Sequence, residues 1–285
     1  MSSVRMRFTK CVVDEAKCTG CGFCLEYNVC HSPGECVGCM SCYWACPYEA
    51  RRVLEIEEER ETVTVEVDGT LREVPKGITV KKALELCGYA FSKVPASGAL
   101  SAPCGTGGCW TCAVEIDGRL ERSCITPVRE GMRIRTDVTD REPLRIIHGP
   151  QPHTVGGKAT PWREKRKGRY IEVAIWVAGC NLRCPQCQNF HVTYDNVTPP
   201  VTPREAAEKI TLYRRRYGVN GLAVSGGEPT LNRRWLVEYF RELRRLNPDP
   251  DARLHLDSNG TLLTPDYIDE LVEAGCNNIG VEPKG

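Results

Sequence analysis

Cysteine spacing constrains this chain more than any other feature of its sequence. Fifteen of its 18 cysteines fall into three groups with short, regular gaps. Cysteines spread evenly through a secreted domain would suggest disulfides, whereas short, regular gaps are typical of metal ligands. Zinc sites usually pair two C-x2-C motifs across a longer gap, and runs of three or four cysteines at two-residue intervals suit iron–sulfur clusters. The sequence therefore predicts an iron–sulfur protein, with a zinc protein as the alternative.

The stretch GCNLRCPQC, residues 179–187, contains a C-x3-C-x2-C motif formed by Cys180, Cys184 and Cys187. Three thiolates on one loop can face a single cubane [4Fe–4S] cluster, which leaves its fourth iron without a protein ligand. A small molecule could bind that open iron. The motif therefore predicts a cluster that takes part in catalysis rather than one that only carries electrons.

Two further cysteine runs lie within residues 1–58, the first predicted domain. The first run comprises Cys18, Cys21 and Cys24, and the second comprises Cys36, Cys39, Cys42 and Cys46. With Pro47 after it, the second run resembles the bacterial ferredoxin motif, in which the fourth cysteine ligates the other cluster. The resemblance implies a ferredoxin-like domain with one [4Fe–4S] cluster on Cys18, Cys21, Cys24 and Cys46 and another on Cys36, Cys39, Cys42 and Cys30.

Cys30 departs from the ferredoxin motif, because five residues instead of three separate it from Cys24 and no proline follows it. Cys11 is the alternative fourth ligand, although a single cysteine in a strand is more often structural. The acidic run at residues 55–61 is interpreted as a solvated boundary of this domain.

Residues 59–138 form the second predicted domain. Alternating apolar and polar residues around Asp68 and Gly69 predict a β-hairpin, and residues 80–87 predict a helix. A C-x4-C-x2-C motif and a fourth cysteine after eleven intervening residues give the plant-type [2Fe–2S] spacing. Its four ligands are Cys104, Cys109, Cys112 and Cys124. The segment after them resembles the closing strands of [2Fe–2S] modules in complex I and molybdenum hydroxylases, and this resemblance implies a β-grasp fold.

Residues 139–168 mix proline, glycine and charge without a sustained period, and they predict a linker. Residues 169–285 then alternate strands with amphipathic helices, which predicts a parallel sheet with helices outside it. In such folds functional groups gather at the C-terminal ends of the strands. Besides the cysteine loop, the candidates at these ends are Gly226, Gly227, Glu228, Pro229, Ser258 and Asn259.

The C-x3-C-x2-C motif after the first of these strands and GGEP after the second resemble radical S-adenosylmethionine (radical SAM) enzymes. The surroundings GCNLRCPQCQN and SGGEPTL resemble the glycyl-radical-enzyme activases, such as pyruvate formate-lyase activating enzyme. The resemblance implies a (β/α) barrel in which S-adenosylmethionine chelates the open iron and Glu228 holds its methionyl ammonium group. Glycine would be required in GGEP because the ligand lies against the backbone. Ser258 and Asn259 would lie near the cofactor.

The chain departs from the family pattern at two points. Gln186 stands where family members have an aromatic or apolar residue near the adenine. Only four of the six expected barrel strands are present, so we expect either a truncated chain or a partner that completes the barrel.

The combined expectation is a radical SAM oxidoreductase with a built-in electron relay of three [4Fe–4S] clusters and one [2Fe–2S] cluster. It would cleave S-adenosylmethionine to a 5′-deoxyadenosyl radical and abstract hydrogen, and the activase resemblance implies a glycyl radical enzyme as the substrate. The alternative is an iron–sulfur electron-transfer adaptor without catalysis of its own. The expected partners are a low-potential electron donor and a protein or small-molecule substrate.

Net charge and hydropathy exclude two further classes of partner. A net charge of +1 gives no basic field for nucleic acid, and the longest strongly apolar run, residues 173–180, is too short to span a membrane. No apolar segment of a signal peptide follows the N-terminal charges. We therefore expect a cytoplasmic protein with no nucleic-acid or membrane partner.

Overall fold

The structure is a computed structural model that describes residues 3–94, 98–154 and 170–284. Its internal contacts divide the chain into two units. The first unit comprises Met1–Arg141 with the short segment Tyr194–Val197, and the second comprises Glu142–Thr193 and Thr198–Gly285. Among the described residues, no helix is long and apolar enough to cross a membrane.

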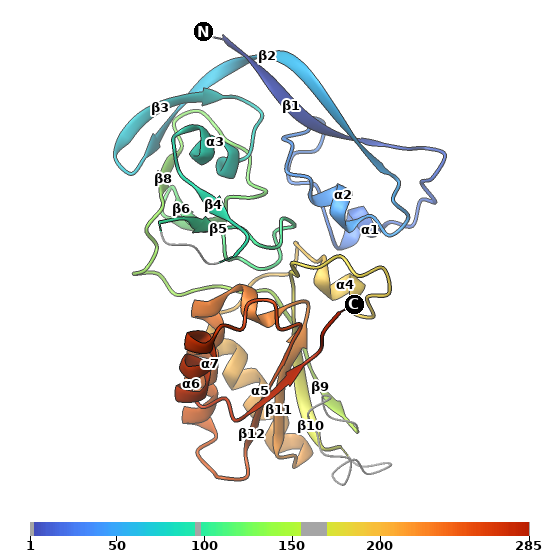
Figure 1. The fold of residues 1–285 in the computed structure, drawn as a ribbon, viewed down its shortest axis with the longest axis vertical. Coiled ribbons are helices and arrows are strands. Elements are labelled where there is room, and N and C mark those ends of the chain that lie inside the picture. Colours follow the sequence, from blue (N-terminus) through green and yellow to red (C-terminus); the bar gives the residue numbers. More distant parts are fainter. Residues whose placement is uncertain (1–2, 95–97, 155–169, 285) are drawn as a thin grey trace. The chain divides into compact units, whose positions relative to one another are not determined.

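The first unit is a mixture of strands and short helices (Figure 1). In chain order its elements are β1 (Ser3–Val13), α1 (Phe23–Glu26), α2 (Ser41–Ala45), β2 (Arg51–Val67), β3 (Thr70–Pro75), α3 (Val80–Leu86), β4 (Phe91–Ser92), β5 (Leu100–Ser101), β6 (Ala113–Ile116), β7 (Arg119–Arg122) and β8 (Arg133–Arg135). The main sheet has the order β1-β2-β8-β6-β7, and β3 pairs with β2.

Strand β2 is 17 residues long and serves both halves of the first unit. Its first part pairs antiparallel with β1, from Val13 opposite Arg51 to Ser3 opposite Glu61, in a long curved ribbon (Figure 1). Its last six residues pair with β3, and two of them also pair with β8. The acidic run at residues 55–61 is therefore strand, and a continuous strand crosses the expected boundary between residues 58 and 59.

The hairpin and the helix expected in the second predicted domain are confirmed. Asp68 and Gly69 connect β2 to β3 with φ angles of 46° and 78°, the positive values that a tight two-residue hairpin turn requires. Helix α3 begins after Thr79, whose hydroxyl accepts a hydrogen bond from the Lys82 N–H. Its buried side chains join those of β2, β3, β6 and β8 in one apolar core.

The second unit contains a five-stranded sheet with the order β13-β12-β11-β10-β9. Its elements are β9 (Ile147–His153), β10 (Glu172–Val177), α4 (Phe190–Thr193), α5 (Pro203–Tyr217), β11 (Gly221–Gly226), the 3-10 helix η2 (Pro229–Leu231), α6 (Arg233–Leu246), β12 (Arg253–Ser258), α7 (Pro265–Glu273) and β13 (Asn278–Val281). Strands β10 to β13 are parallel neighbours, as the alternation of strands and helices predicted.

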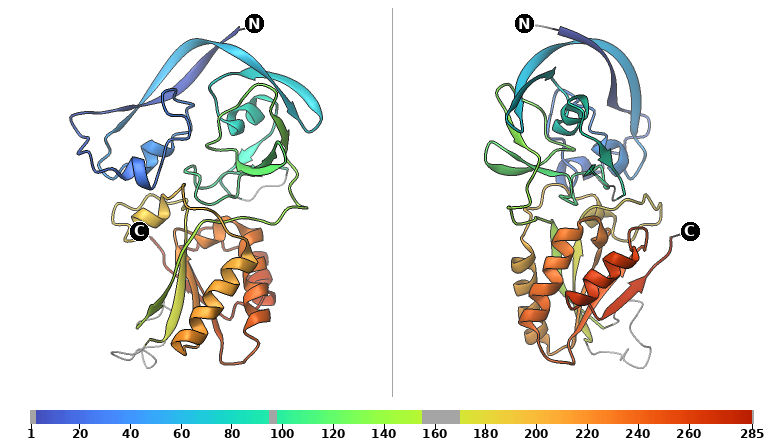
Figure 2. Two further views of the ribbon diagram at one scale, coloured as in Figure 1. Left: turned by 180° about the vertical axis from the view of Figure 1, so that it is seen from behind. Right: turned by 60° about the vertical axis from the view of Figure 1, so that its left-hand side comes forward.

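Helices α5, α6 and α7 cover one face of this sheet (Figure 2). Their apolar sides form a single core with the strands, in which Trp235, Tyr239 and Phe240 of α6 are fully buried. A capping box begins α5, with Thr202 as N-cap and Glu205 closing it. The packed helices stabilise the sheet, and the sheet in turn holds the loops at its strand ends in place.

The expected linker is partly regular structure. Residues Ile147–His153 form β9, which pairs antiparallel with β10 along the edge of the sheet. This strand contains two prolines, which sequence patterns read as interruptions, but an edge strand tolerates proline because one side of it needs no ladder hydrogen bonds. Residues 155–168 of the expected linker lie outside the described part of the chain.

Candidate functional site

The cysteine loop and the GGEP turn lie at adjacent strand ends in the second unit. Strand β10 leads into the cysteine loop, and β11 leads into Gly227 and Glu228. The Gly227 N–H donates to the Val177 carbonyl at 2.8 Å, and the Glu228 N–H donates to the Gly179 carbonyl at 2.8 Å. These two backbone bonds extend the β10–β11 ladder and bring the second motif against the start of the first.

Gly226 and Gly227 have no room for a side chain in this structure. A Cβ atom on Gly226 would lie 2.4 Å from the Val177 nitrogen, and one on Gly227 would lie 2.2 Å from the Gly179 oxygen. The end of β10 and the start of the cysteine loop already fill the space that a side chain would need. The glycines therefore allow the two motifs to approach each other.

Glu228 is the centre of a buried hydrogen-bond network, with only 1% of its surface exposed. Its Oε1 accepts hydrogen bonds from the N–H and hydroxyl of Thr230, at 3.1 and 2.6 Å, and from the Ser258 hydroxyl at 2.8 Å. Its Oε2 accepts from the Asn259 N–H at 2.7 Å. The carboxylate thus ties the end of β12 to the GGEP turn.

Asn259 links this network to the cysteine loop. Its amide Nδ2 donates to Asn181 Oδ1 at 3.0 Å and lies 3.9 Å from Cys180 Sγ. Asn181 in turn donates to the Thr261 hydroxyl at 2.8 Å, and the Leu182 N–H lies 3.4 Å from Cys180 Sγ. Two N–H groups therefore lie near the first thiol of the motif. Hydrogen bonds of this kind orient and tune a sulfur that ligates a metal.

The cysteine loop, the GGEP turn and the end of β12 line one cavity of about 440 Å³ within the second unit. The structure brings the following predicted site residues to its wall: Cys180, Cys184, Cys187, Gly226, Gly227, Glu228, Ser258 and Asn259. Gln186 lies there too, whereas Pro229 is buried at the start of η2 and does not line the cavity. The cavity is large enough for a small-molecule ligand of ordinary size.

The three thiols fit an iron–sulfur cluster chemically. Burial raises the pKa of Cys180 to about 11, so a thiolate at this position needs a bound cation. Soft thiolates select iron–sulfur clusters, copper(I) or zinc, and three of them on one loop suit a cubane with one open iron. Among the described residues, no group of three or more His, Cys, Asp or Glu side chains is arranged to hold a single metal ion.

Arg145 is a buried residue of this site that the sequence did not reveal. It is fully buried, and its guanidinium donates to the carbonyls of Ala178, Glu228 and Pro229 at 2.8 to 3.2 Å. It therefore fixes the backbone on both sides of the site. No sequence motif marks Arg145 within the expected linker, because its hydrogen-bond partners lie 33 to 84 residues away along the chain.

The four expected [2Fe–2S] ligands converge in the first unit. Each of Cys104, Cys109, Cys112 and Cys124 is at most 5% exposed. Thiol–thiol hydrogen bonds pair Cys104 with Cys109 and Cys112 with Cys124, and each bond lowers the thiol pKa of one partner. Four buried sulfurs in two pairs match the ligand demand of two irons, so these residues fit the cluster that the spacing predicted.

The first ferredoxin-type ligand set also meets in one place. Cys18, Cys21, Cys24 and Cys46 line a single cavity of about 240 Å³. The second set is less simple. The Cys11 N–H lies 3.4 Å from Cys36 Sγ, and the Cys11 thiol donates to Met40 Sδ at 3.4 Å. Burial, together with the charges of nearby thiols that include the exposed Cys30, raises the pKa of Cys39. Both candidates for the fourth ligand therefore lie near this group.

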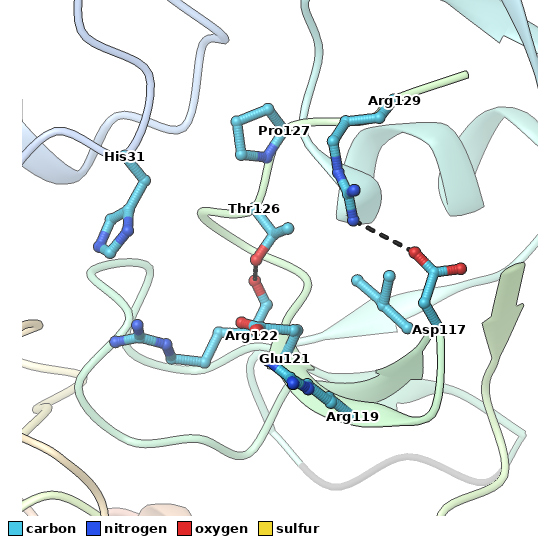
Figure 3. A pocket seen from close by; sticks show the side chains of 9 residues that line it. His31, Asp117, Arg119, Glu121, Arg122, Thr126, Pro127 and Arg129 are labelled. Carbon is cyan, nitrogen blue, oxygen red and sulfur yellow. Dashed lines mark hydrogen bonds and ion pairs between the residues drawn. The ribbon is translucent and has the colours of Figure 1, made fainter. Parts of the chain in front are cut away.

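A further cavity of about 490 Å³ in the first unit carries mostly polar and charged side chains (Figure 3). His31 and Arg122 lie on one side of it, and Arg129 and Asp117 form an ion pair of 3.2 Å on the other. Thr126 projects between them. His31 follows Cys30, and Arg122 precedes Cys124 by two residues, so the cavity adjoins two cysteine-bearing segments.

Comparison with known proteins assigns three segments of the chain. Residues 175–285 match the radical SAM superfamily, residues 60–139 match a 2Fe-2S iron-sulfur cluster binding domain, and residues 29–52 match a 4Fe-4S binding domain. These segments contain the three cysteine groups, apart from the first ferredoxin-type run.

Several curated proteins are similar to part of the chain. They include a probable GTP 3′,8-cyclase of Methanococcus aeolicus, 35% identical over 102 residues, and a 7-carboxy-7-deazaguanine synthase of Hyperthermus butylicus, 32% identical over 99 residues. A putative glycyl-radical enzyme activating enzyme of Methanocaldococcus jannaschii is 28% identical over 99 residues. The three matches cover 35–36% of this chain and 33–39% of the relatives, so the chain spans little more than a third of their length.

Proposed function

Because the chain carries a radical SAM domain fused to 4Fe-4S and 2Fe-2S binding domains, we propose that it is a radical SAM oxidoreductase with its own electron relay. The second unit would form part of a radical SAM barrel, and the first would combine a ferredoxin-like module with a β-grasp [2Fe–2S] module. The observation that carries the proposal is the shared cavity in which three cysteines face the Glu228 network.

Different residues of the cavity would bind the cluster and S-adenosylmethionine. Cys180, Cys184 and Cys187 would hold a [4Fe–4S] cluster, which when bound supplies the electron that cleaves S-adenosylmethionine to methionine and a 5′-deoxyadenosyl radical. Glu228 would place negative charge beside the methionyl ammonium group. Since its carboxylate already accepts four hydrogen bonds, it reaches the ligand with a fixed orientation and no conformational freedom to lose.

The substrate proposal rests on similarity as well as on the cavity. The resulting radical would abstract a hydrogen atom, and the likeness to a glycyl-radical enzyme activating enzyme favours a glycine of a protein partner. A low-potential donor would supply electrons through the clusters of the first unit. Electron transfer to the cluster of Cys180, Cys184 and Cys187 is energetically demanding. Plant-type [2Fe–2S] centres have reduction potentials of about −400 mV, whereas those of [4Fe–4S] clusters reach about −700 mV.

The test is anaerobic reconstitution of the full chain with iron and sulfide, followed by dithionite and S-adenosylmethionine. We expect 5′-deoxyadenosine by liquid chromatography, and none from the matched variant with Cys180, Cys184 and Cys187 changed to alanine. A loaded chain that forms no product, and whose reduced EPR spectrum S-adenosylmethionine does not alter, would instead be an electron-transfer adaptor.

A further inference from the structure

Two cysteine groups of the first unit meet in one small apolar cluster. Cys112, Cys124 and Ile125 form a small buried cluster, and Cys39 packs against it. Cys112 and Cys124 are proposed ligands of the [2Fe–2S] cluster, whereas Cys39 belongs to the second ferredoxin-type group. A residue of each group is therefore part of the same apolar packing.

A buried serine joins the two cysteine motifs beside this contact. The Ser41 hydroxyl lies within hydrogen-bonding distance of Asn28 Oδ1, at 3.0 Å, and of the Thr106 carbonyl, at 3.2 Å. Ser41 precedes Cys42, and Thr106 lies in the loop between Cys104 and Cys109. Asn28, Ser41 and Thr106 are at most 4% exposed, so this bridge is shielded from water.

Asn196 forms a second bridge, from the segment Tyr194–Val197 that belongs to the first unit. Its side chain exchanges two hydrogen bonds with the backbone of Val29, at 3.0 and 3.2 Å, and its N–H donates to the Tyr27 carbonyl. Asn28 anchors the same segment by donating to the Tyr194 carbonyl at 2.8 Å. The segment is thus fixed to the loop that ends at Cys30.

Arg122 ties that segment to the [2Fe–2S] motif. Its Nη1 donates to the Asn196 carbonyl at 2.7 Å and to the Gly107 carbonyl at 3.2 Å. The guanidinium lies 4.8 Å from the centre of the Trp110 ring, and the side chain extends to the side of the cavity where His31 lies (Figure 3). Gly107 is confined as well, because a Cβ atom there would approach Ile125 to 2.5 Å.

We propose that this contact is an electron-transfer junction between the [2Fe–2S] cluster and the [4Fe–4S] cluster of Cys36, Cys39 and Cys42, with Asn28 and Asn196 as its positioning residues. One electron leaves one cluster, which is oxidised, and enters the other, which is reduced. Buried hydrogen-bond networks rigidify their surroundings, so the bridges would hold the two sites at a constant separation. The inference rests on the cluster assignments of the proposed function and is independent of S-adenosylmethionine cleavage.

The test is a potentiometric EPR titration of the reconstituted full chain. At a potential where only the [2Fe–2S] cluster is reduced, its signal should be that of an isolated spin. When the neighbouring [4Fe–4S] cluster is reduced as well, the [2Fe–2S] signal should split or broaden through spin–spin interaction. A spectrum that remains the sum of independent signals would overturn the junction, whether or not 5′-deoxyadenosine forms.

Asn196→Ala tests the positioning role, with Asn277→Ala as its matched control. Asn277 makes the same kind of contacts, since its Oδ1 accepts from the Leu254 N–H and its Nδ2 donates to the Ala252 carbonyl, but it lies in the second unit. We expect loss of the splitting in Asn196→Ala with full iron content, and an unchanged splitting in Asn277→Ala. Equal splitting in both variants would show that Asn196 only stabilises the fold, and Asn28→Ala repeats the comparison should Asn196→Ala fail to fold.

Discussion

At the scale of single residues, Glu228 is the most constrained side chain of the proposed active site. In Glu228→Gln the amide oxygen can replace Oε1. The new NH2 group would then take the place of Oε2, which now accepts a hydrogen bond from the Asn259 N–H, so two donors would face each other. Such a buried donor without an acceptor costs about 2 kcal/mol. We therefore predict a lower melting temperature and weaker binding of S-adenosylmethionine, measured by circular dichroism and by calorimetric titration.

Glu208→Gln is the matched control for that change. Glu208 pairs with Arg204 on the exposed side of α5 at 3.0 Å, and exposed ion pairs of this kind contribute at most about 1 kcal/mol. A similar loss of stability and ligand binding in both variants would contradict the special role of Glu228.

His255 and Asp257 predict a pH dependence of stability in the second unit. Burial alone would lower the pKa of His255, but the hydrogen bond and charge of Asp257 at 2.8 Å outweigh it, so the pKa is raised above 6.5. A raised pKa stabilises the fold fully below pH about 6.5, and the contribution is lost as pH rises through the folded-state pKa.

The measurement compares melting temperatures of the wild type and Asp257→Asn between pH 5.5 and 9. The wild type should have its largest advantage at the acidic end, and the difference should shrink as His255 loses its proton. A difference that is constant across this range would contradict the assignment.

Several site residues were predictable because their signal is local. Cys180, Cys184, Cys187 and Glu228 stand in motifs of a few residues, whose spacing alone carries the chemistry. Arg145 and Asn181 were not predictable, since each acts on atoms contributed by distant parts of the chain. Glycine at position 227 was predicted because a ligand would lie against its backbone, and the structure adds a second reason, since the Gly179 carbonyl of the cysteine loop leaves no room for a Cβ atom.

At the scale of elements, two helices offer a controlled test of capping. Helices α5 and α7 both begin with threonine followed by proline, but only Thr202 of α5 accepts a side-chain hydrogen bond, from the Glu205 N–H. Loss of an N-cap bond costs about 1 kcal/mol. Thr202→Ala should therefore lower the melting temperature of the protein by about 2–4 °C, and Thr264→Ala should lower it less. The reverse order would contradict the capping geometry.

The regular helices and parallel strands of the second unit followed from the sequence, because apolar periodicity and capping residues define them within short windows. Strand β9 did not, since it exists by pairing with β10 rather than by its own pattern. The acidic run was predicted as a solvated boundary, and the structure shows in addition that β2 continues through it, because charged residues are compatible with a strand whose faces remain largely solvated.

At the scale of the whole molecule, the proposed clusters predict a defined metal content. Three [4Fe–4S] clusters and one [2Fe–2S] cluster contain about 14 iron atoms per chain. The variant lacking Cys180, Cys184 and Cys187 should retain about ten and keep the EPR signal of the [2Fe–2S] cluster. Colorimetric iron and sulfide assays measure this directly. A zinc-loaded, colourless protein would refute the cluster assignment altogether.

The uninterrupted course of β2 limits where the molecule can be divided experimentally. A fragment that starts near residue 59 would keep Thr62–Val67, which pair with β3, but would lose β1 and most of the part of β2 that pairs with it. It would also expose unpaired strand edges, which favour aggregation. Soluble fragments for isolating individual clusters should therefore keep Ser3–Val67 intact, even when only the [2Fe–2S] portion is wanted.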